Sequence, residues 1–204
     1  RRRITRCELV NFFSISVDLE RELVAEVAAR IYSERFAEVS DFLFHFLDEE
    51  NSHMWLFATF CHRYANGLYD SGWRSFRVAA DERSEPVRDL VTFGRVLIAE
   101  ELCDWFNTRL GRDERLPELV RTINMVHHRD ESRHMAFGRQ LLRTLATEAT
   151  AEERARAGAY LARYRQLCVN TLYNAAVYRD AGIDRPVQAR RIARGDPGRL
   201  AQNT

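Results

Sequence analysis

Apolar residues recur at helical spacing along most of this chain. In residues 9–32, for example, Phe13, Val17 and Val24 fall on one face of a helix. Glycine and proline, which interrupt helices, number only nine and four in 204 residues. The pattern predicts an all-α fold with long helices over residues 9–32, 36–67, 85–110, 117–145 and 151–181, a connection with some helix over 70–84, and a short helix with a tail over 183–204.

Composition narrows the function classes. The net charge is +1, so no overall field favours nucleic acid or an anionic membrane surface. The arginine runs "RRRITR" and "ARRIARGDPGR" at the two ends are expected to be solvated tails. No apolar run approaches the roughly 20 residues of a membrane span, and no signal peptide is visible. Four scattered cysteines without a CxxC pair predict reduced thiols, and we expect a cytoplasmic protein.

The segment "NMVHHRDESRHMAFGRQ", residues 124–140, carries the most informative polar residues. His127, Glu131 and His134 are spaced by four and three positions and share one ridge of a helix. Glu50 and His53 repeat the Glu-x-x-His spacing on an earlier helix. A carboxylate and an imidazole at i and i+3 can bind one metal ion together. Taken alone, each pair is equally compatible with a surface Glu–His pair or a core histidine bonded to a carboxylate.

Two further carboxylates match these motifs in register. Glu20 precedes Glu50 by 30 positions, and Glu101 precedes Glu131 by 30. In two antiparallel helices joined by a turn, such a spacing places both carboxylates at the same level. The two carboxylates of each pair are therefore predicted to lie at the same level, and the two pairs are predicted to face each other across a helical bundle.

The choice on the third ligand helix lies between two neighbouring glutamates. Glu101 is centred among apolar residues that include Ile98 and Trp105, whereas Glu100 is rotated toward the polar Asp89. We therefore prefer Glu101, and Glu100 remains the alternative.

One Glu from each of two helices and one Glu-x-x-His from each of two others form the ligand set of ferritin-like di-iron and di-manganese bundles. We expect a single helical domain over 1–204, with a ligand-bearing bundle at 9–145 and flanking helices beyond. A helical bundle without metal is the alternative. Glu49 and Asp130, which precede the motif glutamates, are either acceptors for the ligand imidazoles or solvated acids.

His127 adds a third imidazole to this set. It lies one turn before Glu131 and can reach the metal ion that Glu131 and His134 bind. The alternative is a histidine that only hydrogen-bonds a ligand carboxylate.

His-x-x-x-Glu-x-x-His on one helix and Glu-x-x-His on another resemble the AurF-type di-iron N-oxygenases. The likeness covers about residues 9–180. The separation of Glu20 and Glu50 is short for that family, which implies a tight first turn or a loop absent near residues 33–40. The resemblance implies the metal ligands Glu20, Glu50, His53, Glu101, His127, Glu131 and His134.

The resemblance also implies a function: an O2-dependent di-iron N-oxygenase that converts an amine, typically an arylamine, to hydroxylamine, nitroso or nitro products in a biosynthetic pathway. Its cofactor would be two iron ions, with manganese as a substitute. The sequence has no flavin, nicotinamide or iron–sulfur signature, so an external reductase or ferredoxin is expected. Oxygenation of carbon (hydroxylation, desaturation or halogenation), and less so ferroxidase or storage activity, remain alternatives. Homodimerisation is compatible with the apolar outer helices.

Overall fold

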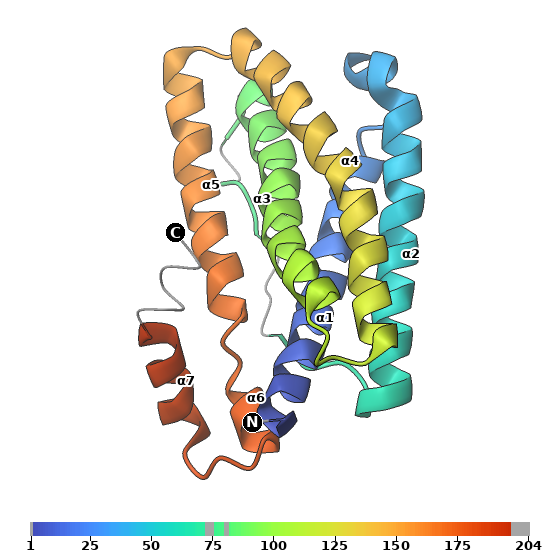
Figure 1. Ribbon diagram of the computed structural model, residues 1–204. Helices are drawn as coiled ribbons and strands as arrows, with labels where there is room; N and C mark the ends of the chain where they lie inside the picture. The colour runs from blue at the N-terminus through green and yellow to red at the C-terminus, as the bar shows by residue number, and fades with distance from the viewer. Residues whose placement is uncertain (1, 72–75, 80–81, 197–204) are drawn as a thin grey trace. The chain divides into compact units, whose positions relative to one another are not determined.

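The computed structural model describes residues 2–71, 76–79 and 82–196, and every regular element among them is helical (Figure 1). No strand occurs in these ranges, so the all-α prediction is confirmed. The elements are α1 (Arg2–Ala28), the 3₁₀ helix η1 (Glu34–Val39), α2 (Ser40–Ala65), α3 (Glu85–Arg112), α4 (Glu118–Glu148), α5 (Ala151–Thr171), α6 (Ala175–Asp180) and α7 (Pro186–Gly195).

The two ends differ from the sequence-based prediction. Helix α1 begins at Arg2, so residues 2–6 of the first arginine run are helical and do not form a tail. The single helix predicted over 151–181 is divided into α5 and α6. Asn174 caps α6, because its side chain accepts a hydrogen bond from the backbone N–H of Ala176 at 2.9 Å. The described part of the 70–84 connection has no helix, and the predictions for 72–75, 80–81 and 197–204 lie outside the described residues.

A tight turn joins α1 to α2. Ser33 caps η1 by accepting from the N–H of Arg35 at 3.3 Å, and η1 leads directly into α2. Phe36 of η1 is buried, and its ring centroid lies 5.1 Å from that of Phe93 on α3. The short separation of Glu20 and Glu50 is therefore accommodated by a compact connection.

The start of α3 follows from its local sequence. The hydroxyl of Ser84 accepts a hydrogen bond from the N–H of Val87 at 3.3 Å, and Pro86 occupies the first turn. This capping fixes where α3 begins and hence the register of its buried residues.

The chain forms two compact units by its internal contacts. One comprises residues 1–18, 54–74 and 166–204, and the other comprises residues 19–53 and 75–165. All the predicted ligands lie in the second unit. None of the described helices is both long and apolar enough to cross a membrane.

Within the second unit, a buried arginine ties three helices together. Arg95 of α3 is 1% exposed and contacts Glu26 at 2.5 Å and also Glu22, both on α1. Its guanidinium carbon lies 5.0 Å from the ring centroid of Tyr164 on α5 and 5.4 Å from that of Phe76. The two carboxylates and two aromatic faces compensate for the loss of hydration of the cation.

Candidate metal centre

Four helices of the second unit bring seven metal-ligating side chains into its interior. Each of the seven is no more than 4% exposed. Helix α1 supplies Glu20, α2 supplies Glu50 and His53, α3 supplies Glu100, and α4 supplies His127, Glu131 and His134.

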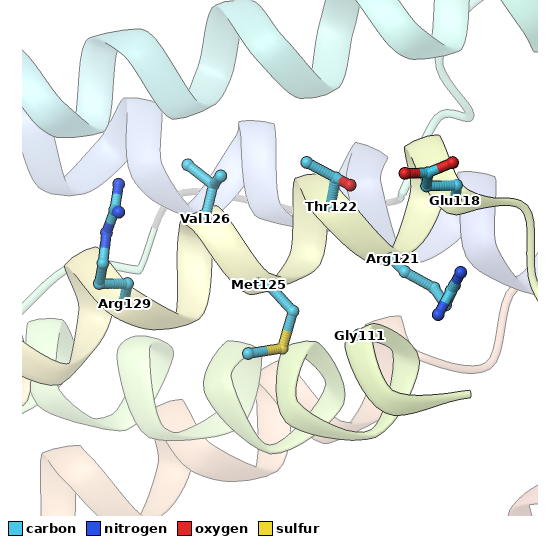
Figure 2. Close-up of a pocket in the computed structure, with 7 residues that line it drawn as sticks. All are labelled: Gly111, Glu118, Arg121, Thr122, Met125, Val126 and Arg129. Atoms are coloured by element: carbon cyan, nitrogen blue, oxygen red, sulfur yellow. The ribbon is translucent and has the colours of Figure 1, made fainter. Parts of the chain in front are cut away.

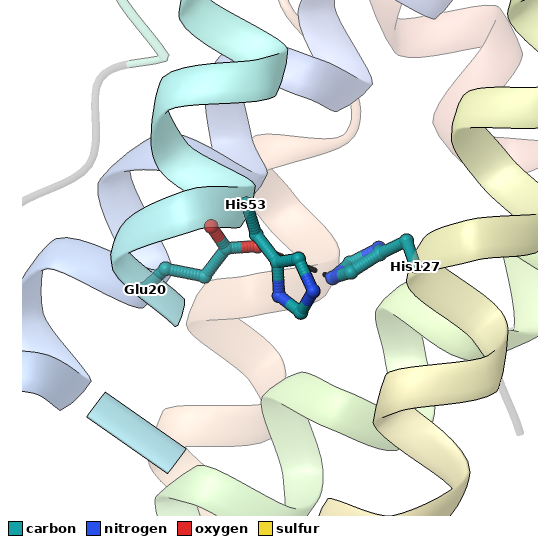
Figure 3. A group of neighbouring side chains, drawn as sticks. All are labelled: Glu20, His53 and His127. Atoms are coloured by element: carbon teal, nitrogen blue, oxygen red, sulfur yellow. Dashed lines mark ion pairs between the residues drawn. The ribbon is translucent and has the colours of Figure 1, made fainter. Parts of the chain in front are cut away.

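These residues form two adjacent groups. Glu20, His53 and His127 make up the first, shown in Figure 3. Glu50, Glu100, Glu131 and His134 make up the second. In each group, one donor atom from every residue lies within 4.8 Å of the donor atoms of the others.

Glu131 joins the two groups. Its Oε1 lies 2.5 Å from Nε2 of His127, and its Oε2 lies 3.2 Å from Nδ1 of His134. Glu50 is also placed between the groups, because its Oε1 lies 2.9 Å from Nδ1 of His134 and 3.7 Å from Nδ1 of His53. Both carboxylates therefore contact histidines of both donor groups.

The outward-facing nitrogens of two histidines contact carboxylates in a crossed arrangement. Nε2 of His53 on α2 lies 3.2 Å from Asp130 on α4, and Nε2 of His134 on α4 lies 2.8 Å from Glu49 on α2. Arg133 links both acceptors, at 2.5 Å from Glu49 and 2.9 Å from Asp130. Each residue before a motif glutamate therefore orients the histidine of the other motif.

The third histidine has a different partner. Nδ1 of His127 lies 2.6 Å from Nδ2 of Asn107, which is fully buried on α3. Asn107 was not among the residues predicted from the sequence. Helical spacing places Asn107 on the same ridge as Val96, Glu100 and Cys103, but this spacing does not indicate its contact with His127 on α4.

The preference for Glu101 is corrected by the structure. Its side chain is 49% exposed and pairs with Arg139 at 2.8 Å, whereas Glu100 is 3% exposed and lies in the cluster. Asp89, which was taken to mark the polar side of α3, is itself buried. The error arose because α3 contacts α1, α4 and α5, so its buried surface is too broad to define one apolar stripe.

Burial and the proximity of other charged groups shift the pKa values of the carboxylates in the cluster. Burial, followed by repulsion from Glu50 and Glu131, raises the pKa of Glu20 well above its usual value. Burial and the charge of Glu50 raise the pKa of Glu131 to about 7. Burial would raise the pKa of Glu50 as well, but hydrogen bonds with His134 and His53 outweigh it and lower that pKa to about 2.

The pKa values of the three imidazoles are also shifted in opposite directions. Burial disfavours the charged form of His134, but hydrogen bonds to Glu131 and Glu50 raise its pKa to about 10. Burial also acts to lower the pKa of His53, but its hydrogen bond with Glu50 and the charge of Glu50 outweigh burial and raise that pKa. Burial, then the neighbouring His53, lowers the pKa of His127 well below its usual value. These opposed shifts show that charge is concentrated here with little water to screen it.

The donor set fits a pair of divalent cations. Both oxygens of Glu20 and Oε2 of Glu50 have no hydrogen-bond partner among the described residues, although they are buried. Buried anionic oxygens are costly unless a cation or a donor compensates them. Four carboxylates carry the charge that two divalent cations neutralise, and mixed oxygen and imidazole ligation suits iron or manganese.

A separate groove opens on the outside of α4. It has a volume of about 390 Å³ and none of the seven clustered residues lines it (Figure 2). Met125 projects from α4 toward α3, where Gly111 leaves room for its sulfur: a Cβ at Gly111 would lie 2.4 Å from that atom. The groove is therefore distinct from the buried cluster. Its lining consists of Gly111, Glu118, Arg121, Thr122, Met125, Val126 and Arg129.

The helical architecture and the buried carboxylate–histidine cluster define a ferritin-like bundle with a candidate dinuclear metal centre. The family model described as P-aminobenzoate N-oxygenase AurF matches residues 1–202, and the chain belongs to this family. It is an oxygenase, and the resemblance inferred from the sequence is confirmed. Searches of curated proteins and of solved structures gave no match.

Proposed function

We propose that this protein is an O2-dependent di-iron oxygenase that N-oxygenates an arylamine of the p-aminobenzoate type. The observation that carries the proposal is the pair of buried donor groups joined by Glu131. Membership of the N-oxygenase family supports the amine as the position of oxidation.

Each group of donors would hold one iron ion. Glu20, His53 and His127 would bind the first. The second would be bound by Glu50, Glu100, Glu131 and His134, with Glu131 and Glu50 able to bridge the pair. Bound ferrous ions would supply the electrons for reducing dioxygen and the oxidising power for attack on the amine.

The protein contributes charge balance and orientation. The carboxylates neutralise the cations in an environment from which bulk water is excluded. Glu49 and Asp130 accept from Nε2–H of His134 and His53, and this contact directs the opposite ring nitrogens toward the centre.

The proposed N-oxygenation requires a donor of electrons. Insertion of one oxygen atom into an N–H bond gives a hydroxylamine, and two electrons with two protons reduce the other oxygen atom to water. Further oxygenation leads to nitroso and nitro products. Neither the sequence motifs nor the donor cluster provides a flavin or iron–sulfur site, so we assign the electrons to an external reductase or ferredoxin.

The test is anaerobic reconstitution with ferrous ion, followed by exposure to isotope-labelled dioxygen with p-aminobenzoate and a reductant. We expect two irons per chain and label in hydroxylamine, nitroso or nitro products. Label on carbon of an acyl substrate, with none on the amine, would favour carbon oxygenation instead. Uptake of many irons per chain without labelled product would indicate ferroxidase or storage activity. Glu101→Gln is the matched control, because this exposed residue lies outside the cluster.

A further inference from the structure

Two acidic residues connect the buried cluster with the surface. Asp130 lies 3.2 Å from Nε2 of His53, and Glu49 lies 2.8 Å from Nε2 of His134. The side chains of these acids are 16% and 31% exposed, and the more exposed Arg133 contacts both of them. Along the seam between α2 and α4, a single residue therefore separates each donor group from solvent.

The groove on the outside of α4 reaches this seam. Arg129 lines the groove, its side chain is 72% exposed, and its Nε lies 3.8 Å from Asp130. Arg121 lines the groove near its other end (Figure 2), and Met125 and Val126 expose apolar surface between the two arginines. A protein that occupied the groove would therefore lie beside an acid that contacts a histidine of the cluster.

The charges of the groove suit an acidic partner. Its lining includes one acid, Glu118, and two arginines, and residues 119–129 contain no aspartate or glutamate. Nε of Arg121 is buried without a hydrogen-bond partner among the described residues, so a carboxylate that entered the groove would satisfy this donor. Apolar side chains at the centre with cations beside them favour the attraction and the correct orientation of an acidic protein.

The chemistry proposed for the cluster requires a partner that delivers electrons. Each N-oxygenation consumes two electrons, and the cluster that would receive them is buried. Complexes of electron-transfer proteins are generally transient and bury less than about 1,200 Å² of surface, and opposite charges steer their formation. A groove of about 390 Å³ flanked by two arginines fits an encounter of this kind.

We propose that the α4 groove is the docking site of a small acidic one-electron carrier of the ferredoxin type. Two reduced carriers would each give up one electron per N-oxygenation. These two electrons, with two protons, reduce to water the oxygen atom of O2 that does not enter the N–H bond. The need for this carrier rests on the function proposed above, and docking at the groove places the carrier beside the residues that link solvent to both donor groups.

The test uses the absence of lysine from the sequence, in which all 31 Lys and Arg residues are arginines. Arg129→Lys and Arg143→Lys each introduce one side-chain amine on α4 without changing the charge. Arg143 is the matched control, because it is exposed on the same helix and does not line the groove. A carbodiimide joins an amine to a carboxylate that is in contact with it.

The full chain, loaded with iron, is mixed with a plant-type two-iron, two-sulfur ferredoxin as the acidic probe, and cross-linked peptides are identified by mass spectrometry. The two positions lie roughly 21 Å apart along the helix, so a docked ferredoxin should couple at least about 10-fold more in Arg129→Lys than in Arg143→Lys. Equal coupling in the two variants would overturn the docking site.

Removal of charge gives a second readout. The double variant Arg121→Gln, Arg129→Gln should raise the Kd for ferredoxin by about 3–30-fold at low ionic strength. This difference from wild type should shrink as the ionic strength rises from about 0.02 to about 0.2 M, because salt screens exposed charges. The double variant Arg139→Gln, Arg143→Gln removes the same charge from α4 and should leave the Kd within about twofold of wild type. An equal rise in both double variants would also overturn the docking site.

Neither readout depends on turnover, so the docking site and the proposed function can fail separately. Labelled N-oxygenated product formed with a chemical reductant, together with equal coupling in Arg129→Lys and Arg143→Lys, would overturn the docking site alone. Absence of that product with the same reductant would count against the proposed function and, with it, the need for a carrier. If the Arg121→Gln, Arg129→Gln variant fails to fold, the charge-preserving lysine variants still decide the question.

Discussion

Oε2 of Glu49 lies 2.8 Å from Nε2 of His134, so a carboxylate on α2 orients a buried imidazole on α4. Asp130 on α4 makes the reciprocal contact with His53 on α2. The crossed pairs couple the orientation of the ligands to the packing of these two helices. Arg133, which contacts both acceptors, limits their mutual repulsion.

Replacing Glu49 tests this coupling. Glu49→Gln removes an anionic acceptor from His134 and should weaken metal binding by about 10–100-fold while leaving the fold intact. Competitive titration with Co(II) or Fe(II) measures the change. The adjacent polar position Asp48 lies outside the donor groups, and Asp48→Asn is the control. Equal affinities for the two variants would contradict an orienting role for Glu49.

Neighbouring glutamates on α3 allow the corrected assignment to be checked. Glu100→Gln should reduce tightly bound metal below two ions per chain, because it removes a buried donor from the second group. Glu101→Gln should bind the wild-type amount, because the exposed Glu101 only pairs with Arg139 on the surface. Elemental analysis after gel filtration decides between them; loss of metal in Glu101→Gln alone would restore the sequence-based preference.

Metal binding should stabilise the protein. At a free-metal concentration about 100 times Kd, binding to the folded state contributes about 2.7 kcal/mol, which corresponds to a rise in Tm of about 5–10 °C. Glu20→Gln should lose most of this rise. Without metal its Tm should remain near that of wild type, because burial already favours the uncharged form of Glu20. Differential scanning fluorimetry with and without Mn(II) or Fe(II) measures both effects.

Chelator-treated protein should lose stability as the pH rises from 7 to 9. The folded-state pKa of His134, about 10, lies above the unfolded value of about 6.5, so its stabilising effect is complete below pH 6.5 and disappears as pH rises through 10. The raised pKa of His53 acts in the same direction. For the one proton of His134 we expect a decrease in Tm of up to about 3–5 °C per pH unit. A slope in His134→Gln as steep as in wild type would refute this origin.

The buried Arg95 is predicted to be a structural cation. Arg95→Met should lower the free energy of unfolding by about 3 kcal/mol, because it leaves Glu22 and part of Glu26 without their counter-charge. The Tm should fall by roughly 6–12 °C. Arg139→Gln, which breaks an exposed pair, should cost less than about 1 kcal/mol. Similar losses in both variants by urea denaturation would show that burial of Arg95 is not decisive.

Local sequence determined the helical class, the two Glu-x-x-His motifs and the third histidine. Helical periodicity fixes which residues share a ridge, so the spacing of His127, Glu131 and His134 is sufficient to group them. The capped start of α3 at Ser84 was also predictable, since its signal is confined to a few adjacent residues.

Tertiary packing decided what periodicity could not. Glu100 and Glu101 differ by one helical step, and only the contacts of α3 with three other helices determine which of them is buried. Asn107 could be assigned a role only because α3 and α4 bring it to His127; a hydrogen bond between side chains of different helices leaves no regular trace along the chain. Likewise, the sequence indicated that Glu49 and Asp130 could hold histidines, but only the packing of α2 against α4 determined that each holds the histidine of the opposite helix.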